Sequence, residues 1–216
     1  MLLALEMLAD ALRVGLNTPY PINISRQDEI ADPSSDALTA DAISIMVARR
    51  LPEQSIIIDE AITSVGQIHA LADVLPPHDT LSLTGGSIGI GIPLATGASI
   101  AAPDRKVVAL QADGSGMYTV QGLWTQAREK LNVVTIIYAN SAYRILQGEM
   151  TNVGVNEYGR NARRMLALDE PRLDWCSIAK GMGVEAGRAD TAQAFRRLLD
   201  SAMAGDGPFL IEATIE

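Results

Sequence analysis

Five short apolar runs that alternate with stretches of helical composition constrain the fold of this chain more than any other feature. The runs lack the strict polar–apolar alternation of a sheet with one face in water, so we expect strands buried on both faces. Such strands, separated by helices, are typical of a three-layer α/β domain in which helices cover both faces of a parallel sheet. The expected strands are residues 55–59, 81–83, 106–112, 133–139 and 209–214, and the expected helices are residues 39–51, 63–73, 90–102, 116–129, 174–182 and 191–204.

Two other parts of the chain depart from this alternation. Residues 1–14 place leucines at helical spacing before Gly15, which predicts an amphipathic helix, and the polar residues 17–36 look like a linker. The polar, glycine-containing residues 148–172 predict a long irregular loop, which in a compact domain is usually a lid or a mobile segment.

Charge and composition disfavour several classes of protein. The 17 Lys and Arg residues against 26 Asp and Glu give a net charge of −9, and aromatic residues make up only 4% of the chain. Nucleic-acid binders are usually basic and often stack bases on aromatic side chains, so we expect no nucleic-acid partner. No apolar run approaches the roughly 20 residues of a membrane span, and no secretion signal is evident. We therefore expect a soluble, cytoplasmic protein.

A glycine-rich segment, TGGSIGIGIP, follows the second expected strand at residues 84–93. Glycines at the start of a helix let the backbone approach a ligand closely. Gly89 and Gly91 supply the first half of the dinucleotide fingerprint G-x-G-x-x-G, but Leu94 stands at the position of its third glycine. Taken alone, the segment leaves open a nicotinamide or flavin site and a close contact between helix and sheet.

Polar residues follow the third and fourth expected strands, and ligands bind at the carboxyl ends of strands in such sheets. Asp113, Gly114 and Ser115 suit Mg²⁺ and phosphate oxygens, or form a simple helix-capping turn. Asn140 lies 27 residues beyond Asp113, one strand–helix–strand repeat later, and alone is typical of a turn. If the two strands are neighbours, the pair suits an octahedral Mg²⁺ site completed by a backbone carbonyl and phosphate oxygens. The chain has no G-x-x-x-x-G-K-[ST] loop, which excludes a P-loop nucleoside triphosphatase.

Three segments in this order resemble the diphosphate-binding domain of thiamine-diphosphate-dependent enzymes. They are DEAITS at residues 59–64, GGSIGIGIP at residues 85–93, and DGS at residues 113–115 followed by Asn140. The last is similar to the family's metal motif, G-D-G-[SA]…N-N, and the first is similar to the acetolactate synthase and benzoylformate decarboxylase branch. The resemblance implies a diphosphate- and magnesium-binding domain of this fold over residues 37–216. Residues 1–36 would then be the tail of a preceding domain plus a linker.

The resemblance also implies roles for individual residues. Mg²⁺ would be held by the side chains of Asp113 and Asn140 and by the backbone carbonyl of Ala142. Thiamine diphosphate would contact Thr63, Gly86, Ile88, Gly114, Ser115 and Tyr143, with Ile88 as the apolar wedge that bends the cofactor, and Ile145 and Leu146 would face the substrate.

The chain departs from the family pattern at three positions. Ala112 replaces the first glycine of the metal motif and Ala139 replaces the first asparagine, but neither position supplies a metal ligand in the family. Yeast-type pyruvate decarboxylases carry a glutamate at the position of Leu146, so the leucine argues against that subgroup.

The resemblance implies an enzyme, a lyase or transferase, that acts on a small 2-oxo acid. An acetolactate-synthase-like carboligase is favoured, and an aryl 2-oxo acid decarboxylase of the benzoylformate type is the alternative. Two other classes stay open at this point. One is an oxidoreductase domain that binds nicotinamide or flavin, and the other is a non-catalytic assembly module.

The family's activating glutamate belongs to a separate pyrimidine-binding domain, for which this chain has no room. Glu60 follows a strand of the diphosphate-binding domain, on the wrong side of the cofactor to replace it. We therefore expect no catalytic residue in this chain and no activity from it alone. Its expected partner is a pyrimidine-binding domain of the same or another chain, in a homodimer or tetramer.

Overall fold

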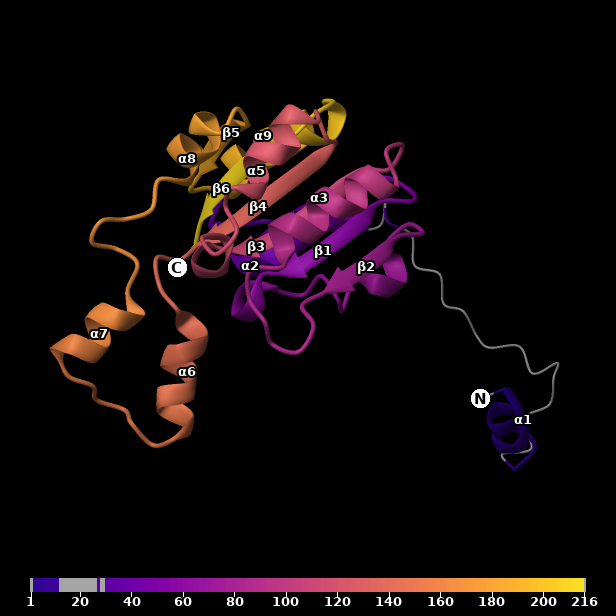
Figure 1. Cartoon of the computed structure of the whole chain (residues 1–216), viewed down its shortest axis with the longest axis horizontal. Helices are drawn as coiled ribbons and strands as arrows, with labels where there is room; N and C mark the ends of the chain where they lie inside the picture. The colour runs from indigo at the N-terminus through magenta and orange to yellow at the C-terminus, as the bar shows by residue number, and fades with distance from the viewer. Residues whose placement is uncertain (1, 12–26, 28–29, 216) are drawn as a thin grey trace.

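A computed structural model describes residues 2–11, 27 and 30–215 of the chain. These described residues form one six-stranded sheet in the order β2-β1-β3-β4-β6-β5, and all neighbouring strands are parallel (Figure 1). The strands are β1 (Ile56–Glu60), β2 (Asp79–Ser82), β3 (Val107–Ala112), β4 (Val133–Ala139), β5 (Glu185–Ala189) and β6 (Phe209–Thr214). The five expected strands are confirmed, two of them, β4 and β6, with the expected bounds.

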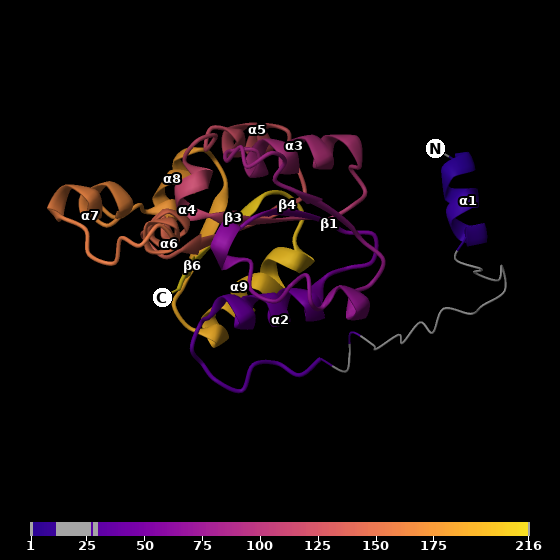
Figure 2. The same ribbon diagram turned by 90° about the horizontal axis from the view of Figure 1, so that it is seen from below.

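Helices cover both faces of the sheet, which confirms the expected three-layer α/β architecture (Figure 2). One face carries α2 (Ala40–Arg50) and α9 (Ala192–Ala204), and the other carries α3 (Gly91–Ala101), α5 (Gly122–Arg128) and α8 (Trp175–Gly181). Successive side chains of a strand point to opposite faces. In β1, Ile57 therefore packs with α2 and α9, whereas Ile56 and Ile58 pack beside α3.

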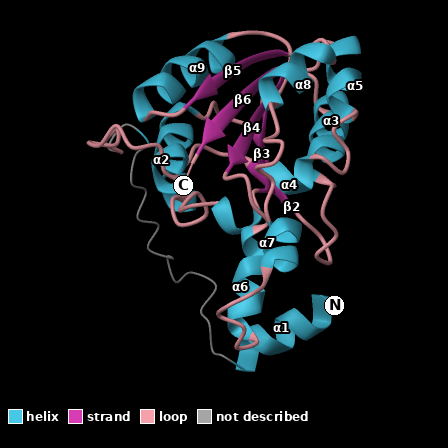
Figure 3. Cartoon of the chain, turned by 90° about the vertical axis from the view of Figure 1, so that its left-hand side faces the viewer, coloured by secondary structure: helices cyan, strands magenta, loops and turns pink. Residues whose placement is uncertain are grey.

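The remaining elements lie outside the three layers. They are α1 (Leu2–Ala11), the short 3₁₀ turns η2 (Ile62–Ser64) and η3 (Ala72–Val74), α4 (Asp113–Gly116), α6 (Arg144–Asn152) and α7 (Arg160–Leu166). The strand arrows in Figure 3 point toward the end of the domain from which α6 and α7 extend. No helix within the described ranges is long and apolar enough to cross a membrane.

The expected helix over residues 63–73 is wrong, because only η2 and η3 form there. Gly66 has a positive φ of 61°, which breaks a right-handed helix. A Cβ atom at this glycine would lie 2.5 Å from the Ala40 carbonyl oxygen, so the segment passes too close to α2 for a larger residue. Ser44 of α2 also donates a hydrogen bond to the Val65 carbonyl, 3.1 Å away.

The irregular loop expected over residues 148–172 is also wrong, since α6 and α7 occupy much of it. No residue of α6 is buried, and Leu166 is the one buried residue described in α7. Periodic burial is the main signal for a helix in a sequence, and these two helices lack it. The edge strand β5 was not predicted for a similar reason, because its sequence EAGRA contains no apolar run.

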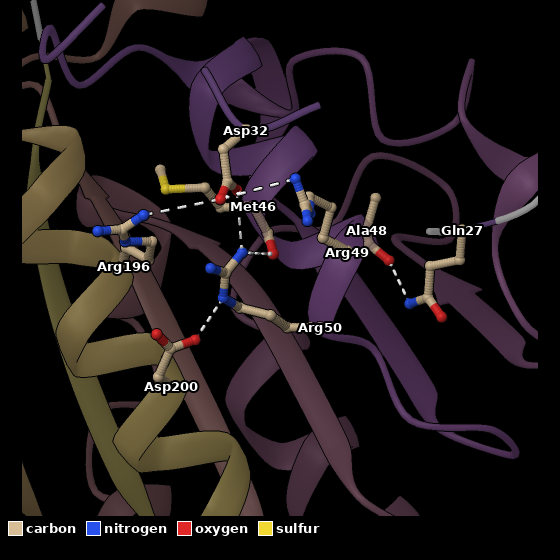
Figure 4. A network of polar contacts seen from close by, with 8 residues as sticks. All are labelled: Gln27, Asp32, Met46, Ala48, Arg49, Arg50, Arg196 and Asp200. Atoms are coloured by element: carbon tan, nitrogen blue, oxygen red, sulfur yellow. Dashed lines mark hydrogen bonds and ion pairs between the residues drawn. The ribbon is translucent and has the colours of Figure 1, made fainter. Parts of the chain in front are cut away.

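The predicted amino-terminal helix is confirmed over Leu2–Ala11, and the expected linker over residues 17–36 falls largely outside the described residues. The part of that linker that is described lies against α2 and α9. A carboxylate oxygen of Asp32 lies 3.6 Å from Arg49, 3.3 Å from Arg50 and 3.7 Å from Arg196, as nitrogen–oxygen distances (Figure 4). These ion pairs connect the described part of the linker to α2 and α9. The domain boundary at residue 37 stays a prediction.

Candidate cofactor-binding site

The order of the strands reverses at one place in the sheet. The chain places β2 on one side of β1 and then returns to place β3 on the other side. In open parallel sheets, ligands bind outside the carboxyl ends of the strands at such a reversal. The three segments singled out in the sequence follow β1, β2 and β3, and Asn140 follows the neighbouring strand β4. The topology therefore brings them to one edge.

A cavity of about 150 Å³ lies at this edge. All the expected cofactor and metal residues line it, together with Ile145. Leu146 does not line it, and this side chain is 47% exposed on α6. The full lining is Ile62, Thr63, Ser64, Leu83, Gly86, Ile88, Ala112, Asp113, Gly114, Ser115, Asn140, Ala142, Tyr143, Arg144 and Ile145. The roles of these residues toward a ligand stay predictions.

Asp113 begins α4 directly after β3 and is only 3% exposed. Its Oδ1 atom accepts a hydrogen bond from the Gly114 amide at 2.9 Å, and its Oδ2 atom accepts one from the Ser141 amide at 2.7 Å. Burial raises the pKa of this carboxyl group above its usual value, although the two amides lower it. The hydrogen bonds thus offset only part of the cost of burying this charge, and a nearby cation would favour the charged form of the carboxylate.

Asn140 and Ala142 supply further oxygen atoms beside Asp113. The Asn140 Oδ1 atom accepts a hydrogen bond from the Ala142 amide at 3.0 Å, and its Nδ2 atom donates to Ser64 Oγ at 3.4 Å. Among the described residues, no hydrogen-bond donor reaches the Ala142 carbonyl oxygen. No group of three or more His, Cys, Asp or Glu side chains that could hold a metal occurs in the described ranges. The donor set of carboxylate, amide and backbone oxygens therefore fits Mg²⁺ completed by phosphate oxygens, rather than a transition metal.

Gly114 and Tyr143 lie against each other on the wall of this cavity. A Cβ atom at Gly114 would lie 2.8 Å from Cδ1 of the Tyr143 ring, so a glycine is required there. Burial raises the pKa of the Tyr143 hydroxyl, and the nearby Tyr118 and Asp113 raise it further. The aromatic ring and the α4 turn thus form one side of the cavity.

Two residues of this edge have strained backbones. Ile62 has a φ of 58° and Ser141 a φ of 56°, a left-handed conformation that non-glycine residues rarely adopt. Ile62 lines the cavity, and the amide of Ser141 donates to Asp113. Such strain concentrates at binding sites, where it holds groups in a geometry that the local sequence does not favour.

Glu60, which was considered above as a substitute for the activating glutamate, instead binds backbone amides within the domain. The side chain is 1% exposed and turns toward the glycine-rich segment. Its Oε1 atom accepts hydrogen bonds from the amides of Gly89 and Ile90, and its Oε2 atom accepts one from Gly91 at 2.6 Å. A dinucleotide-binding fingerprint needs these helix-start amides for a pyrophosphate. Because an internal carboxylate occupies them, the nicotinamide or flavin interpretation of this turn is disfavoured.

The fold and the site together define a class of protein, and comparison with known proteins agrees. The family model of the thiamine pyrophosphate enzyme, C-terminal TPP binding domain, matches residues 64–213. The chain belongs to the thiamine pyrophosphate enzyme family, and it contains the family's C-terminal TPP-binding domain. The family resemblance noted in the sequence is thereby confirmed.

Particular relatives refine this assignment. The chain is 43% identical to IlvX of Mycobacterium tuberculosis, a candidate acetolactate synthase large subunit, over 98% of this chain and 40% of that protein. It is 31% identical to a benzoylformate decarboxylase of Pseudomonas aeruginosa, over 97% of this chain and 38% of that protein. The solved 4-hydroxybenzoylformate decarboxylase of Rhodococcus jostii RHA1 superimposes with a TM-score of 0.77 at 28% identity, over 98% of this chain and 38% of that one. This chain thus spans about two fifths of the length of these relatives.

Proposed function

We propose that this chain binds thiamine diphosphate through Mg²⁺ at the carboxyl ends of β1, β3 and β4, as part of an enzyme that acts on 2-oxo acids. One observation carries the proposal. A single cavity collects the buried Asp113 carboxylate, the Asn140 amide and the Ala142 backbone from two neighbouring strand ends. It also collects Gly86 and Ile88 from the glycine-rich turn, so a ligand with an anionic end and an apolar ring system fits it.

The residues of this chain would bind and orient the cofactor. Asp113, Asn140 and the Ala142 carbonyl would hold Mg²⁺, while the backbone of Gly114 and the hydroxyl of Ser115 would bind the diphosphate. Ile88, which is 36% exposed at the cavity, offers an apolar surface to the organic part of the cofactor. When bound, thiamine diphosphate supplies an electron sink for the electron pair released as CO₂ leaves a 2-oxo acid.

For the reaction we favour an acetolactate-synthase-like carboligation, which would join two 2-oxo acids with loss of one CO₂. The 43% identity to IlvX supports this choice. An aryl 2-oxo acid decarboxylase is the second candidate, favoured by the apolar Ile145 in the cavity wall and by the similarity to two benzoylformate-type decarboxylases. The two reactions are separated by product. Pyruvate would yield acetolactate in the first case, and benzoylformate would yield benzaldehyde in the second.

The working enzyme would also need a pyrimidine-binding domain that supplies the activating glutamate, from the same or another chain in a homodimer or tetramer. Apolar side chains next to the cavity support a partner there. Tyr118 is 59% exposed, Met117 is 38% exposed and Ile145 is 45% exposed. We therefore expect no turnover from this chain alone and place the complete enzyme in the cytoplasm.

A thermal melt tests the cofactor site directly. Thiamine diphosphate and Mg²⁺ together, at about 100 times the dissociation constant, should stabilise the chain by roughly 2.7 kcal/mol. That is a rise of about 5–11 °C in the melting midpoint, at about 2–4 °C per kcal/mol for a chain of this size. Each component alone should have little effect, and Asp113→Ala should abolish the shift. If no shift appears even when a pyrimidine-binding domain is added, the proposed function is wrong.

A further inference from the structure

We propose that Glu60 and Gln111 are positioning residues that join the two halves of this site through a buried chain of hydrogen bonds. One half is the glycine-rich turn with Gly86 and Ile88, and the other is the turn with Asp113 and Ser115. The inference rests on the proposed function, because it treats both turns as parts of one cofactor site.

The first link of the chain fixes the glycine-rich turn. Glu60 ends β1, and its carboxylate receives the amides of Gly89, Ile90 and Gly91 at the start of α3. Hydrogen bonds to a carboxylate are stronger than neutral ones, and a negative charge is favourable at a helix amino terminus. The carboxylate therefore determines where α3 begins. It thereby determines where Gly86 and Ile88, a few residues upstream, lie at the cavity.

The second link runs through Gln111 of β3, whose side chain reaches the same buried space as the Glu60 carboxylate. Its Nε2 atom donates to Glu60 Oε2 at 3.1 Å and to Ser115 Oγ at 2.5 Å. Because Ser115 Oγ accepts this hydrogen bond, its own hydrogen is left to be donated elsewhere. In this structure Ser115 Oγ lies 3.2 Å from the Ala112 carbonyl oxygen, and with a diphosphate bound it can donate to a phosphate oxygen instead. Gln111 thus sets the direction of the Ser115 hydroxyl.

The buried space around Glu60 and Gln111 is closely packed, yet one of its polar atoms has no partner. A Cβ atom at Gly91 would clash with Gln111 Oε1 and lie 2.7 Å from Glu60 Oε2, so a glycine leaves room for both side chains. Gln111 is fully buried, yet its Oε1 atom has no hydrogen-bond partner among the described residues. A buried polar atom without a partner is destabilising, so an apolar residue would serve the core better. A role in orienting Ser115 explains why glutamine is present.

Two ligands allow the two halves of the site to be tested separately. Inorganic pyrophosphate with Mg²⁺ reports on the Asp113–Ser115 half only, whereas thiamine diphosphate with Mg²⁺ reports on both halves. We would measure both affinities by calorimetry, in the presence of the pyrimidine-binding domain, for the unchanged chain and for Glu60→Gln, Gln111→Met and Glu53→Gln. The last is a matched control, because Glu53 is exposed.

We expect Glu60→Gln to weaken thiamine diphosphate binding about tenfold or more and to change pyrophosphate binding much less. Gln111→Met should weaken both ligands in the unchanged chain but have no further effect in a Ser115→Ala chain, because Gln111 acts through the Ser115 hydroxyl. Glu53→Gln should weaken neither ligand. A merely structural role would lower both affinities together in Glu60→Gln, and that result would overturn the inference. If the unchanged chain binds neither ligand, the proposed function itself has failed, which is a different outcome.

Amide hydrogen exchange on the unchanged, ligand-free chain keeps the inference testable even if the variants fold poorly. The amides of Gly89, Ile90 and Gly91 should exchange slowly although the glycine-rich segment is a loop. Those of Gly85 and Gly86, at the exposed part of the same segment, should exchange fast. Fast exchange at all five positions would show that Glu60 does not hold the turn.

Discussion

The carboxyl ends of β1 and β3 lie side by side in the sheet, and each carries a buried carboxylate. The Glu60 carboxylate receives three backbone amides and the Gln111 side chain, all from within the domain. The Asp113 carboxylate receives two amides and faces a cavity, and burial raises its pKa. The same functional group at the same edge therefore serves two purposes. The internally bonded carboxylate holds the backbone, whereas the incompletely compensated one is where a ligand would complete the structure.

The largest effect should come from filling the space in front of Glu60. In Gly91→Ala the added methyl group would clash with the Gln111 side chain and with the Glu60 carboxylate, and we expect a loss of about 3 kcal/mol in the free energy of unfolding. Urea denaturation followed by circular dichroism measures it. Gly97→Ala is the control in the same helix, because no atom lies within 4 Å of a Cβ there. That variant should be neutral or gain up to about 1 kcal/mol. Equal losses in both variants would contradict the role assigned to Glu60.

A smaller loss is expected when the charge alone is removed. Glu60→Gln keeps the size of the side chain but places an NH₂ group against backbone N–H donors, so we expect a loss of about 2 kcal/mol. The exposed Glu53→Gln variant should stay within about 0.5 kcal/mol of the unchanged chain. If Glu60→Gln changes the free energy of unfolding no more than Glu53→Gln does, Glu60 does not hold the backbone, and the contrast drawn with Asp113 is wrong.

Asp113 should give the smallest effect and a distinct dependence on pH. Its raised pKa means that the folded chain holds the proton more tightly than the unfolded chain does. The stability linked to this group is therefore greatest below its ordinary pKa of 3.8, and it is lost as the pH rises through the raised value in the folded chain. We expect Asp113→Asn to lack this loss, so its stability relative to the unchanged chain should increase from pH 4 to pH 7. If the stabilities of the two chains depend on pH in the same way, the Asp113 carboxylate is already stabilised by its hydrogen bonds, and the expectation is wrong.

The sequence predicted the buried parts of the fold better than the exposed parts. Strands β3, β4 and β6 were found because their residues are apolar on both faces, as a covered parallel sheet requires. The edge strand β5 and helices α6 and α7 were missed because little of their surface is buried. The segment after β1 was misassigned as a helix because the contact of Gly66 with α2 joins parts of the chain that a local pattern cannot relate.

The sequence predicted most of the singled-out residues that line the cavity, but not the hydrogen bonds that support them. The residues that line the cavity stand at strand ends, where position along the chain already indicates a site. The hydrogen bonds of Glu60 join residues 29 to 31 positions apart and depend on which way the side chain turns. A carboxylate that ends an apolar strand ahead of a glycine-rich helix start was the available signal. Glu60 was considered only as a substitute for the activating glutamate, a role that its position after β1 argued against, and backbone support was not predicted.

The order of strands in the sheet also has a consequence for how the chain folds as it is synthesised. Strand β6 lies between β4 and β5, although it comes after both in the sequence. Until residues 209–214 leave the ribosome, β5 has no neighbour to pair with and β4 has one open edge. An unpaired strand edge is a template for association with other chains. A nascent chain that is held just short of these residues would therefore be the species most in need of a chaperone.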